Sequence, residues 1–319
     1  MRHVSLKELM TMRSAVYTVC SVFVTVGLFA AGPVYAQAPQ NPPVPPPVPT
    51  LPPGQVAGGP PAPVVTIIGE EYRVEFSAGA WVTRPSTVEY SDTETLTNTV
   101  GSTTTTTVVN GTLVNFRSLL ALPNLTFPEG HITVRIAPRQ KVRGEYIPLH
   151  YKQTVSPLST TFNFNGQTYK AGDTVESTYR WNEWKVAYEF DAIVFDRGFV
   201  GGQAALSAMN ISAAMANTAQ SGTASVTILM PGLGAIGRYY LTSRISVTAD
   251  FFGFWLPGSG TSTHAHSLEI DGYGMFNFNK HVGAQVGVRA WDAAHVWSNP
   301  LNTGSITVVG PYFGGTARF

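Results

Sequence analysis

The last ten residues, 310–319, constrain the fold more than any other stretch of this chain. Taken at every second position, one face carries Pro311, Phe313, Gly315, Ala317 and Phe319, and the other carries Tyr312, Gly314, Thr316 and Arg318. A side-chain period of two belongs to a β-strand, in which successive residues point to opposite faces. The pattern therefore predicts a final strand that has one apolar face and ends on an aromatic side chain.

Nine more segments of this kind precede the last one. We predict strands at about 70–83, 131–137, 142–154, 177–191, 200–216, 224–240, 245–255, 268–278, 282–291 and 310–319. Their connections are alternately long and short, as an up-and-down barrel with both termini at one end requires. Segment 200–216 is rich in alanine and also fits a helix, which would leave eight strands.

The composition narrows the class of protein. No run of eighteen uncharged apolar residues occurs after the N-terminus, which rules out a helical membrane protein. A formal net charge of +1 gives no reason to expect nucleic acid as a partner. A soluble β-sandwich would turn polar residues to water where these long strands carry apolar ones. We therefore predict an all-β fold, a single antiparallel up-and-down transmembrane β-barrel of ten strands, with eight as the alternative.

The chain is divided into three parts. Basic residues, an apolar run and small residues before Ala36 predict a signal peptide at 1–36, with Met1 or Met12 as the true start. Cys20 is the only cysteine and lies in that segment, so the mature chain has no disulfide, catalytic thiol or thiolate metal site. Residues 37–69 are Pro-rich and predict a disordered periplasmic linker, followed by the barrel at 70–319.

Two connections are long enough to be functional loops. The segment 84–130 is rich in threonine, and we expect it to be extracellular, with a hairpin of its own at Asn110-Gly111. The segment 155–176 contains turn signals at Asn165-Gly166.

Two strands depart from regular alternation. Pro148 lacks a backbone N–H, so we expect a bulge there. Tyr179 and Trp181 lie on the polar face of their strand, which suggests either a register change or part of an aromatic girdle.

The alternation assigns twelve charged residues to the lumen. They are Arg73, Glu75, Arg135, Lys185, Glu189, Asp191, Arg238, Asp250, Glu269, Asp271, Arg289 and Arg318. Six are basic and six acidic, and an interior this narrow favours paired networks over separate charges. A selective pore usually carries an excess of one sign, so the balance favours a structural role over a channel.

Several stretches resemble the small outer-membrane barrels of the OmpA/OmpW-like superfamily. They are Gly237-Arg238-Tyr239-Tyr240, Ser246-Val247-Thr248-Ala249-Asp250 and Tyr312-Phe313-Gly314-Gly315, and the resemblance covers about 70–319. It implies a bacterial outer-membrane location with both termini periplasmic, surrounded by lipid and lipopolysaccharide. It also implies that Tyr312, Phe313 and Phe319 form the signal that the barrel-assembly machinery reads. These motifs identify a barrel and no activity.

One group of residues suggests chemistry. His264 and His266 precede Ser267 and Glu269 near the extracellular end of a strand, where a histidine pair can bind metal or act as a base. The residues do not match those of omptin-like proteases or lipid A deacylases, and no phosphate loop, nucleophile elbow or zinc motif is present.

We therefore predict no enzyme, cofactor or metal site. The expected function is a structural or surface-interaction role through long extracellular loops. A narrow channel for small solutes or ions is the alternative, and an outer-membrane enzyme is third.

Overall fold

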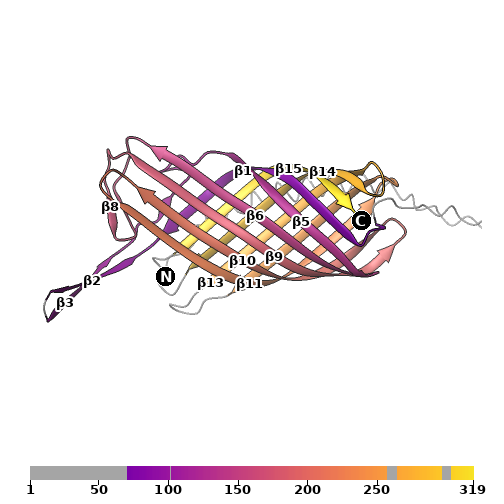
Figure 1. Cartoon of the computed structure of the whole chain (residues 1–319), viewed down its shortest axis with the longest axis horizontal. Coiled ribbons are helices and arrows are strands. Elements are labelled where there is room, and N and C mark those ends of the chain that lie inside the picture. Colours follow the sequence, from indigo (N-terminus) through magenta and orange to yellow (C-terminus); the bar gives the residue numbers. More distant parts are fainter. Residues whose placement is uncertain (1–69, 101, 257–263, 297–302) are drawn as a thin grey trace, which may run out of the picture. The chain divides into compact units, whose positions relative to one another are not determined.

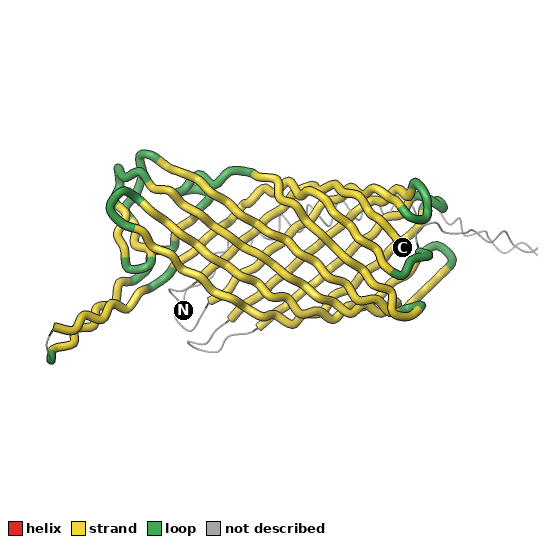
Figure 2. The backbone as a smooth tube through the Cα atoms, viewed as in Figure 1, coloured by secondary structure: helices red, strands yellow, loops and turns green. Residues whose placement is uncertain are grey.

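The computed structural model describes residues 70–100, 102–256, 264–296 and 303–319 (Figures 1 and 2). The predicted signal peptide and linker, the loop at 257–263 and most of the connection at 299–304 lie outside these ranges. Within them, no helix is long and apolar enough to cross a membrane.

Ten long strands form one closed antiparallel barrel. They are β1 (Val74–Ser91), β5 (Leu125–Ala137), β6 (Gln140–Val155), β9 (Val175–Phe195), β10 (Gly198–Ala216), β11 (Ser221–Tyr240), β12 (Ile245–Leu256), β13 (His264–Asn277), β14 (Val282–Val296) and β15 (Thr303–Arg318). Each pairs with the next, and β15 pairs with β1 to close the barrel. The ten-strand prediction is confirmed. The helix alternative for 200–216 is wrong, because β10 pairs on both sides from Gly198 to Ala216.

The two ends of the barrel differ, as Figure 1 shows. We call the end with the four short turns, Val74 and Phe319 the turn end, and the opposite one the loop end. The loop end carries five short strands: β2 (Glu94–Val100), β3 (Thr103–Val109), β4 (Val114–Asn115), β7 (Phe162–Phe164) and β8 (Gln167–Tyr169).

The turn predicted at Asn165-Gly166 and the hairpin predicted at Asn110-Gly111 had different outcomes. Asn165 and Gly166 join β7 to β8, and both have positive φ, as the tight turn requires. The hairpin in the Thr-rich segment instead pairs Val100 with Thr103, so its turn precedes Asn110-Gly111 by several residues. The β-branched threonines favour extended backbone, so they form a strand of the hairpin.

No bulge occurs at Pro148. The register between β6 and β9 runs without a shift from Gln140 to Val155. The pairing of β6 with β5 ends at Tyr146, before the proline. Pro148 therefore lies where β6 has no partner on that side, and its missing N–H removes no hydrogen bond to β5.

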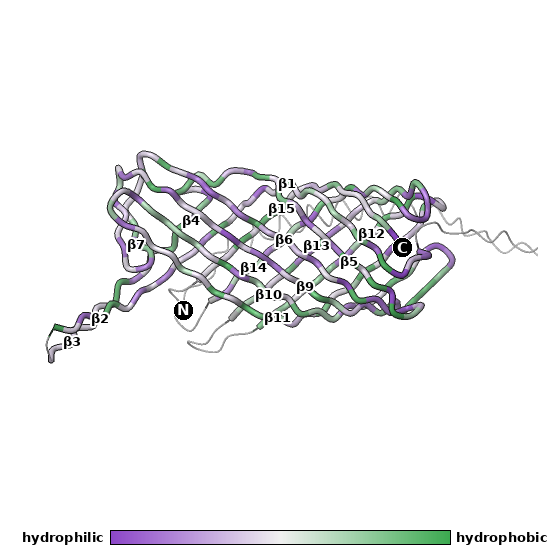
Figure 3. The backbone as a smooth tube through the Cα atoms, in the orientation of Figure 1, coloured by the Kyte–Doolittle hydropathy of each residue, from purple (hydrophilic) through white to green (hydrophobic). Residues whose placement is uncertain are grey.

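Hydrophobic and hydrophilic residues alternate along the barrel strands (Figure 3), and their burial shows which of them face outward. On β9, Trp184, Val186 and Tyr188 are exposed to the outside, while Ala187 and Glu189 are buried. The same holds around the barrel for Phe76, Ile132, Leu206, Leu233, Phe251, Val286 and Phe313, all of them exposed. Apolar side chains exposed over a whole wall are expected to face lipid.

Candidate functional site in the barrel interior

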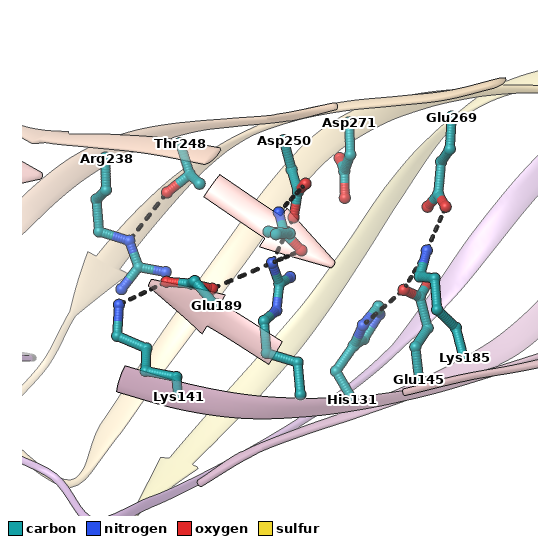
Figure 4. A network of polar contacts seen from close by, with 12 residues as sticks. His131, Lys141, Glu145, Lys185, Glu189, Arg238, Thr248, Asp250, Glu269 and Asp271 are labelled. Atoms are coloured by element: carbon teal, nitrogen blue, oxygen red, sulfur yellow. Dashed lines mark hydrogen bonds and ion pairs between the residues drawn. The ribbon is translucent and has the colours of Figure 1, made fainter. Parts of the chain in front are cut away.

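Charged side chains gather in the half of the interior that is nearer the turn end, and Figure 4 shows several of their contacts. Arg289 of β14 is its most connected member and is 2% exposed. Its guanidinium lies 3.0 Å from Glu129, 3.1 Å from Glu145, 3.0 Å from Asp271 and 3.4 Å from Glu269. These carboxylates come from β5, β6 and β13, so one cation joins four strands across the lumen.

A second group lies across β6, β9 and β12. The ammonium of Lys141 is 2.7 Å from Glu189 and 3.0 Å from Asp191. Arg143 is 2.6 Å from Asp250 and 3.5 Å from Glu189, which joins the two sets of pairs. Because the charges compensate one another at hydrogen-bond distance, their burial is tolerated.

Glu70, just before β1, extends the network toward the turn end. Its carboxylate is 2.6 Å from Arg135 and 2.9 Å from Arg238, and it accepts a 2.9 Å hydrogen bond from the Tyr240 hydroxyl. Burial alone would raise the pKa of Glu70, but the charges of Arg238, Lys141 and Arg135 outweigh it and hold that pKa below its usual value.

This lowered pKa predicts a pH-dependent contribution to stability. We expect Glu70→Gln to lower the free energy of unfolding by about 1–2 kcal/mol at pH 7. A carboxylate with a depressed folded-state pKa stabilises above its unfolded-state pKa, about 4.3 for Glu, and loses this effect as pH falls through the folded-state pKa. The difference between wild type and variant should therefore vanish in acid.

Urea unfolding in phospholipid vesicles from pH 7 to pH 3 measures this difference. Glu71→Gln is the control, because Glu71 is an exposed neighbour with no ion pair within the described residues. A wild-type advantage over Glu70→Gln that is the same at pH 3 and pH 7 would contradict the ion-pair assignment.

Most of the predicted lumen residues lie inside. Those that face the interior are Glu75, Arg135, Lys185, Glu189, Asp191, Arg238, Asp250, Glu269, Asp271, Arg289 and Arg318. Arg73 is exposed instead. The N–H groups of Arg73 and Val74 both donate to the carbonyl oxygen of Phe319, at 2.7 Å and 3.1 Å. Two residues opposite one form a bulge, which reverses the alternation before Val74 and places Arg73 outside.

The alternation pattern also missed several interior charges. They are Glu70, Glu129, Lys141, Arg143, Glu145 and Glu183. Glu129 and Lys141 lie in segments that the sequence pattern assigns to connections. Glu183 is an even number of positions from Glu189 on the same strand, so alternation predicts that it faces inward too. With these residues the turn-end half holds seven basic and ten acidic side chains among the described residues. It thus departs from the expected balance of six and six.

The loop-end half of the interior is apolar. Trp81, Trp181 and Trp291 are at most 1% exposed, and the rings of Trp181 and Trp291 meet edge to face at 5.4 Å. The indole N–H of Trp81 donates to the carbonyl oxygen of Gly310, and that of Trp291 to the hydroxyl of Ser267. This half therefore has the character of a protein core.

The segment after β4 adds side chains to this core. Phe116, Leu120 and Leu122 are buried, and the ring of Phe116 lies 5.2 Å from that of Tyr179. Tyr179 and Trp181 thus point inward, and β9 has no register shift near them. The interpretation as a girdle or register change is wrong, because aromatic side chains on the inner face find an apolar surrounding there.

Small cavities lie among the charged side chains of the turn-end half. Two cavities beside Arg143 and Arg289 have volumes of about 20 Å³ and 40 Å³. Each has room for one or a few water molecules. Among the described residues, the interior thus changes along the barrel from ion pairs to packed aromatic rings.

The residues of the predicted assembly signal lie on both faces of β15. Tyr312 is buried, and its hydroxyl donates to Asp271 at 3.1 Å. Phe313 and Phe319 are exposed on the outer wall, and the ring of Phe319 meets that of Phe76 at 6.3 Å.

The histidine group near the loop end is divided between the two faces. His266 lies on the outer face, where its Nε2 is 3.1 Å from Asp292 and its ring stacks on Trp255 at 5.6 Å. Ser267 and Glu269 face inward. The structure thus supplies a carboxylate partner that the sequence did not reveal, and separates His266 from the two neighbours expected beside it.

The pair of His266 and Asp292 lacks both a nucleophile in contact with the imidazole and a third metal ligand among the residues whose side chains are described. The hydroxyl of Thr307 donates to the carboxylate of Asp292 at 2.6 Å. It therefore does not contact the imidazole of His266, which would have to act as its base. The side chain of His264 lies outside the described set. Among the residues that the structure describes, no three His, Cys, Asp or Glu side chains are placed to share a metal ion.

Closure of the barrel by β15 and β1 leaves none of the ten long strands at a sheet edge, and the wall is apolar outside, as a lipid bilayer demands. The chain is therefore a transmembrane β-barrel of the outer-membrane type. No protein-family model matches it, and no curated protein is similar to it in sequence.

Solved structures with a similar arrangement of strands are outer-membrane proteins. The outer-membrane protease OmpT from Escherichia coli has 8% identity over 79% of this chain and 98% of its own, with a TM-score of 0.47. A Pseudomonas aeruginosa FadL homologue has 8% identity over 78% and 90%, with a TM-score of 0.33. The Pseudomonas putida toluene transporter TodX has 6% identity over the same shares, with a TM-score of 0.29. The function of this chain must therefore be argued from its own residues.

Proposed function

We propose that the protein is a non-conducting barrel of the bacterial outer membrane, with its turn end periplasmic, that acts through contacts made at its loop end. The filled interior carries this proposal. A solute entering from the turn end would have to separate Arg289 and Arg143 from their carboxylates, and each buried charge left without its partner costs about 3–5 kcal/mol. It would then meet the packed rings of Trp181 and Trp291.

The hairpin β2–β3 is the surface that we propose makes these contacts. Nearly all of its residues are exposed, including Thr103 to Thr107. The two strands form a separate sheet, so each has an outer edge with free backbone groups. Such edges favour partners that add a strand. Asn165 holds the base of the hairpin through hydrogen bonds to Asp92 and Glu94, at 3.0 Å and 3.4 Å.

One observation favours the channel as a second candidate. The excess of acidic over basic side chains in the turn-end half is what a cation-selective lumen needs. A channel also requires a path through the apolar half, which would have to come from movement of the segment that carries Phe116 and Leu120.

Conductance of the refolded mature protein in a planar bilayer separates the two candidates. We expect no steady openings in KCl at any voltage at which the bilayer is stable. Reproducible openings would overturn the non-conducting barrel and establish the channel.

The contact role needs a separate test. Replacing residues 95–108 with a Gly-Ser-Gly turn should abolish clumping of cells that display the protein, while the heat-modifiable barrel persists. A variant with Thr103 to Thr107 changed to serine keeps the backbone edge and should still clump. Wild-type cells that stay dispersed, or clumping that survives loss of the hairpin, would contradict the proposal.

We also propose that the barrel-assembly machinery binds the last strand. The exposed rings of Phe313 and Phe319 on the outer face of β15 support this interaction. Lipid and lipopolysaccharide are then the surroundings of the outer wall.

A further inference from the structure

We propose that the outer wall near the turn end holds one phospholipid, with an acyl chain in a groove across β15, β1, β5 and β6 and its phosphate at Arg73. The assignment to a phospholipid rests on the periplasmic turn end of the proposed function. The site has no part in the interior network or in the hairpin.

The floor of the groove consists of small residues on three neighbouring strands. Ala78 of β1 pairs with Gly315 of β15 on one side and with Gly130 of β5 on the other. A methyl group added at Gly130 would meet nothing within 4 Å, and one at Gly315 only a backbone oxygen at 3.9 Å. The resulting hollow has a volume of about 790 Å³.

Large apolar side chains form the walls. Tyr146 and Trp184 stack with their ring centroids 4.1 Å apart and rise beside Gly130. Phe76 and Ile132 pair with each other on the side toward the turn end. A hydrocarbon chain in such a hollow gains dispersion contacts on several sides, which a flat wall does not offer. The surrounding medium is hydrocarbon, so a lipid chain is the natural occupant.

Arg73 lies at the foot of this groove. Its N–H donates to Phe319 at the end of β15, and its carbonyl accepts from the N–H of Arg135 on β5. The bulge before Val74 turns the Arg73 side chain outward, where it is exposed and has no ion-pair partner within the described ranges. An arginine at this level can bind a phosphate through two parallel N–H groups.

The distance between Arg73 and the floor of the groove matches the thickness of one membrane leaflet. Ala78 follows Arg73 by five residues, which is about 17 Å along a strand and about 13 Å across a membrane at the usual tilt. Half of the hydrocarbon core is about 15 Å. The groove therefore serves the leaflet at the turn end, which the proposed orientation makes the periplasmic, phospholipid leaflet and not the lipopolysaccharide one.

Native mass spectrometry of the full-length mature barrel, extracted in mild detergent, tests the site. We expect wild type to retain one phospholipid per barrel. Ala78→Phe fills the groove and should abolish retention, and Arg73→Gln should lower the retained fraction about tenfold, as the loss of one charge-assisted contact would. The controls are Ala204→Phe, exposed on the outer wall of β10, and Arg197→Gln, exposed in the turn after β9. Both should retain lipid as wild type does.

Each other outcome counts against the site. A wild-type barrel without lipid, or equal losses in Ala78→Phe and Ala204→Phe, would overturn it. Retention of lipopolysaccharide in place of phospholipid would contradict the assignment of the groove to the periplasmic leaflet. A dimer that Ala78→Phe disrupts would assign the groove to a second copy of this chain. Conductance is independent of all these results. A conducting barrel would overturn the non-conducting role and leave the orientation and this site unaffected.

Discussion

We expect the substitution Arg289→Met to lower the free energy of unfolding by about 3–5 kcal/mol, the cost of removing one partner from a buried ionic network. Arg289 is 2% exposed and lies within 3.4 Å of four carboxylates. Methionine fills much of the same volume but leaves these carboxylates without their cation. Lys185 still neutralises Glu145 and Glu269, whereas Glu129 and Asp271 have no other cation that close within the part of the chain that the structure describes.

Reversible urea unfolding in phospholipid vesicles at neutral pH measures this loss. Arg244→Met is the matched control, because Arg244 is exposed in the turn between β11 and β12. Its substitution should change the unfolding free energy by less than about 0.5 kcal/mol. If both variants unfold at the wild-type midpoint, the turn-end half is a hydrated interior and not a paired network.

The second large effect is expected in the apolar half. Trp181→Ala should destabilise the barrel by about 3–5 kcal/mol, as truncation of a buried aromatic side chain does in a packed core. Trp181 is 1% exposed and meets the ring of Trp291 edge to face. The cavity left behind is enclosed by other apolar side chains, so it can neither collapse fully nor gain from hydration.

Trp184→Ala provides the control on the same strand. Trp184 is 61% exposed on the outer wall, where its main protein contact is the stack on Tyr146. Its loss should cost about 1 kcal/mol, the value of an aromatic pair, because lipid replaces the side chain. Equal losses for the two tryptophans would contradict the division into a packed interior and a lipid-facing wall.

The local pattern of the chain was sufficient for the architecture. Alternation such as Trp184, Val186 and Tyr188 against Lys185 and Glu189 predicted both the strands and the face that each side chain occupies. This works because a strand has a fixed period of two, and lipid outside selects apolar residues at every second position. The same rule predicted ten strands and left eight as the alternative.

The alternation pattern failed to predict the position of a side chain where a backbone bulge or a residue distant in sequence determines that position. The parity of Arg73 depends on a bulge against Phe319, nearly 250 positions away, which no neighbouring residue reveals. Tyr179 and Trp181 did not fit the expected polar lumen. Alternation predicts which side chains face inward, but it does not predict which side chains surround them there.

The sequence by itself determined a closed barrel, its apolar wall and the inward side of eleven of the twelve charges assigned to the lumen, because these follow from the periodicity of each strand. The choice between ten strands and eight needed the pairing of β10 on both sides. Only the tertiary structure decided that ion pairs fill one half of the interior and aromatic rings the other. The register between strands sets which side chains share a level, and the segment with Phe116 and Leu120 enters from a connection that has no periodicity.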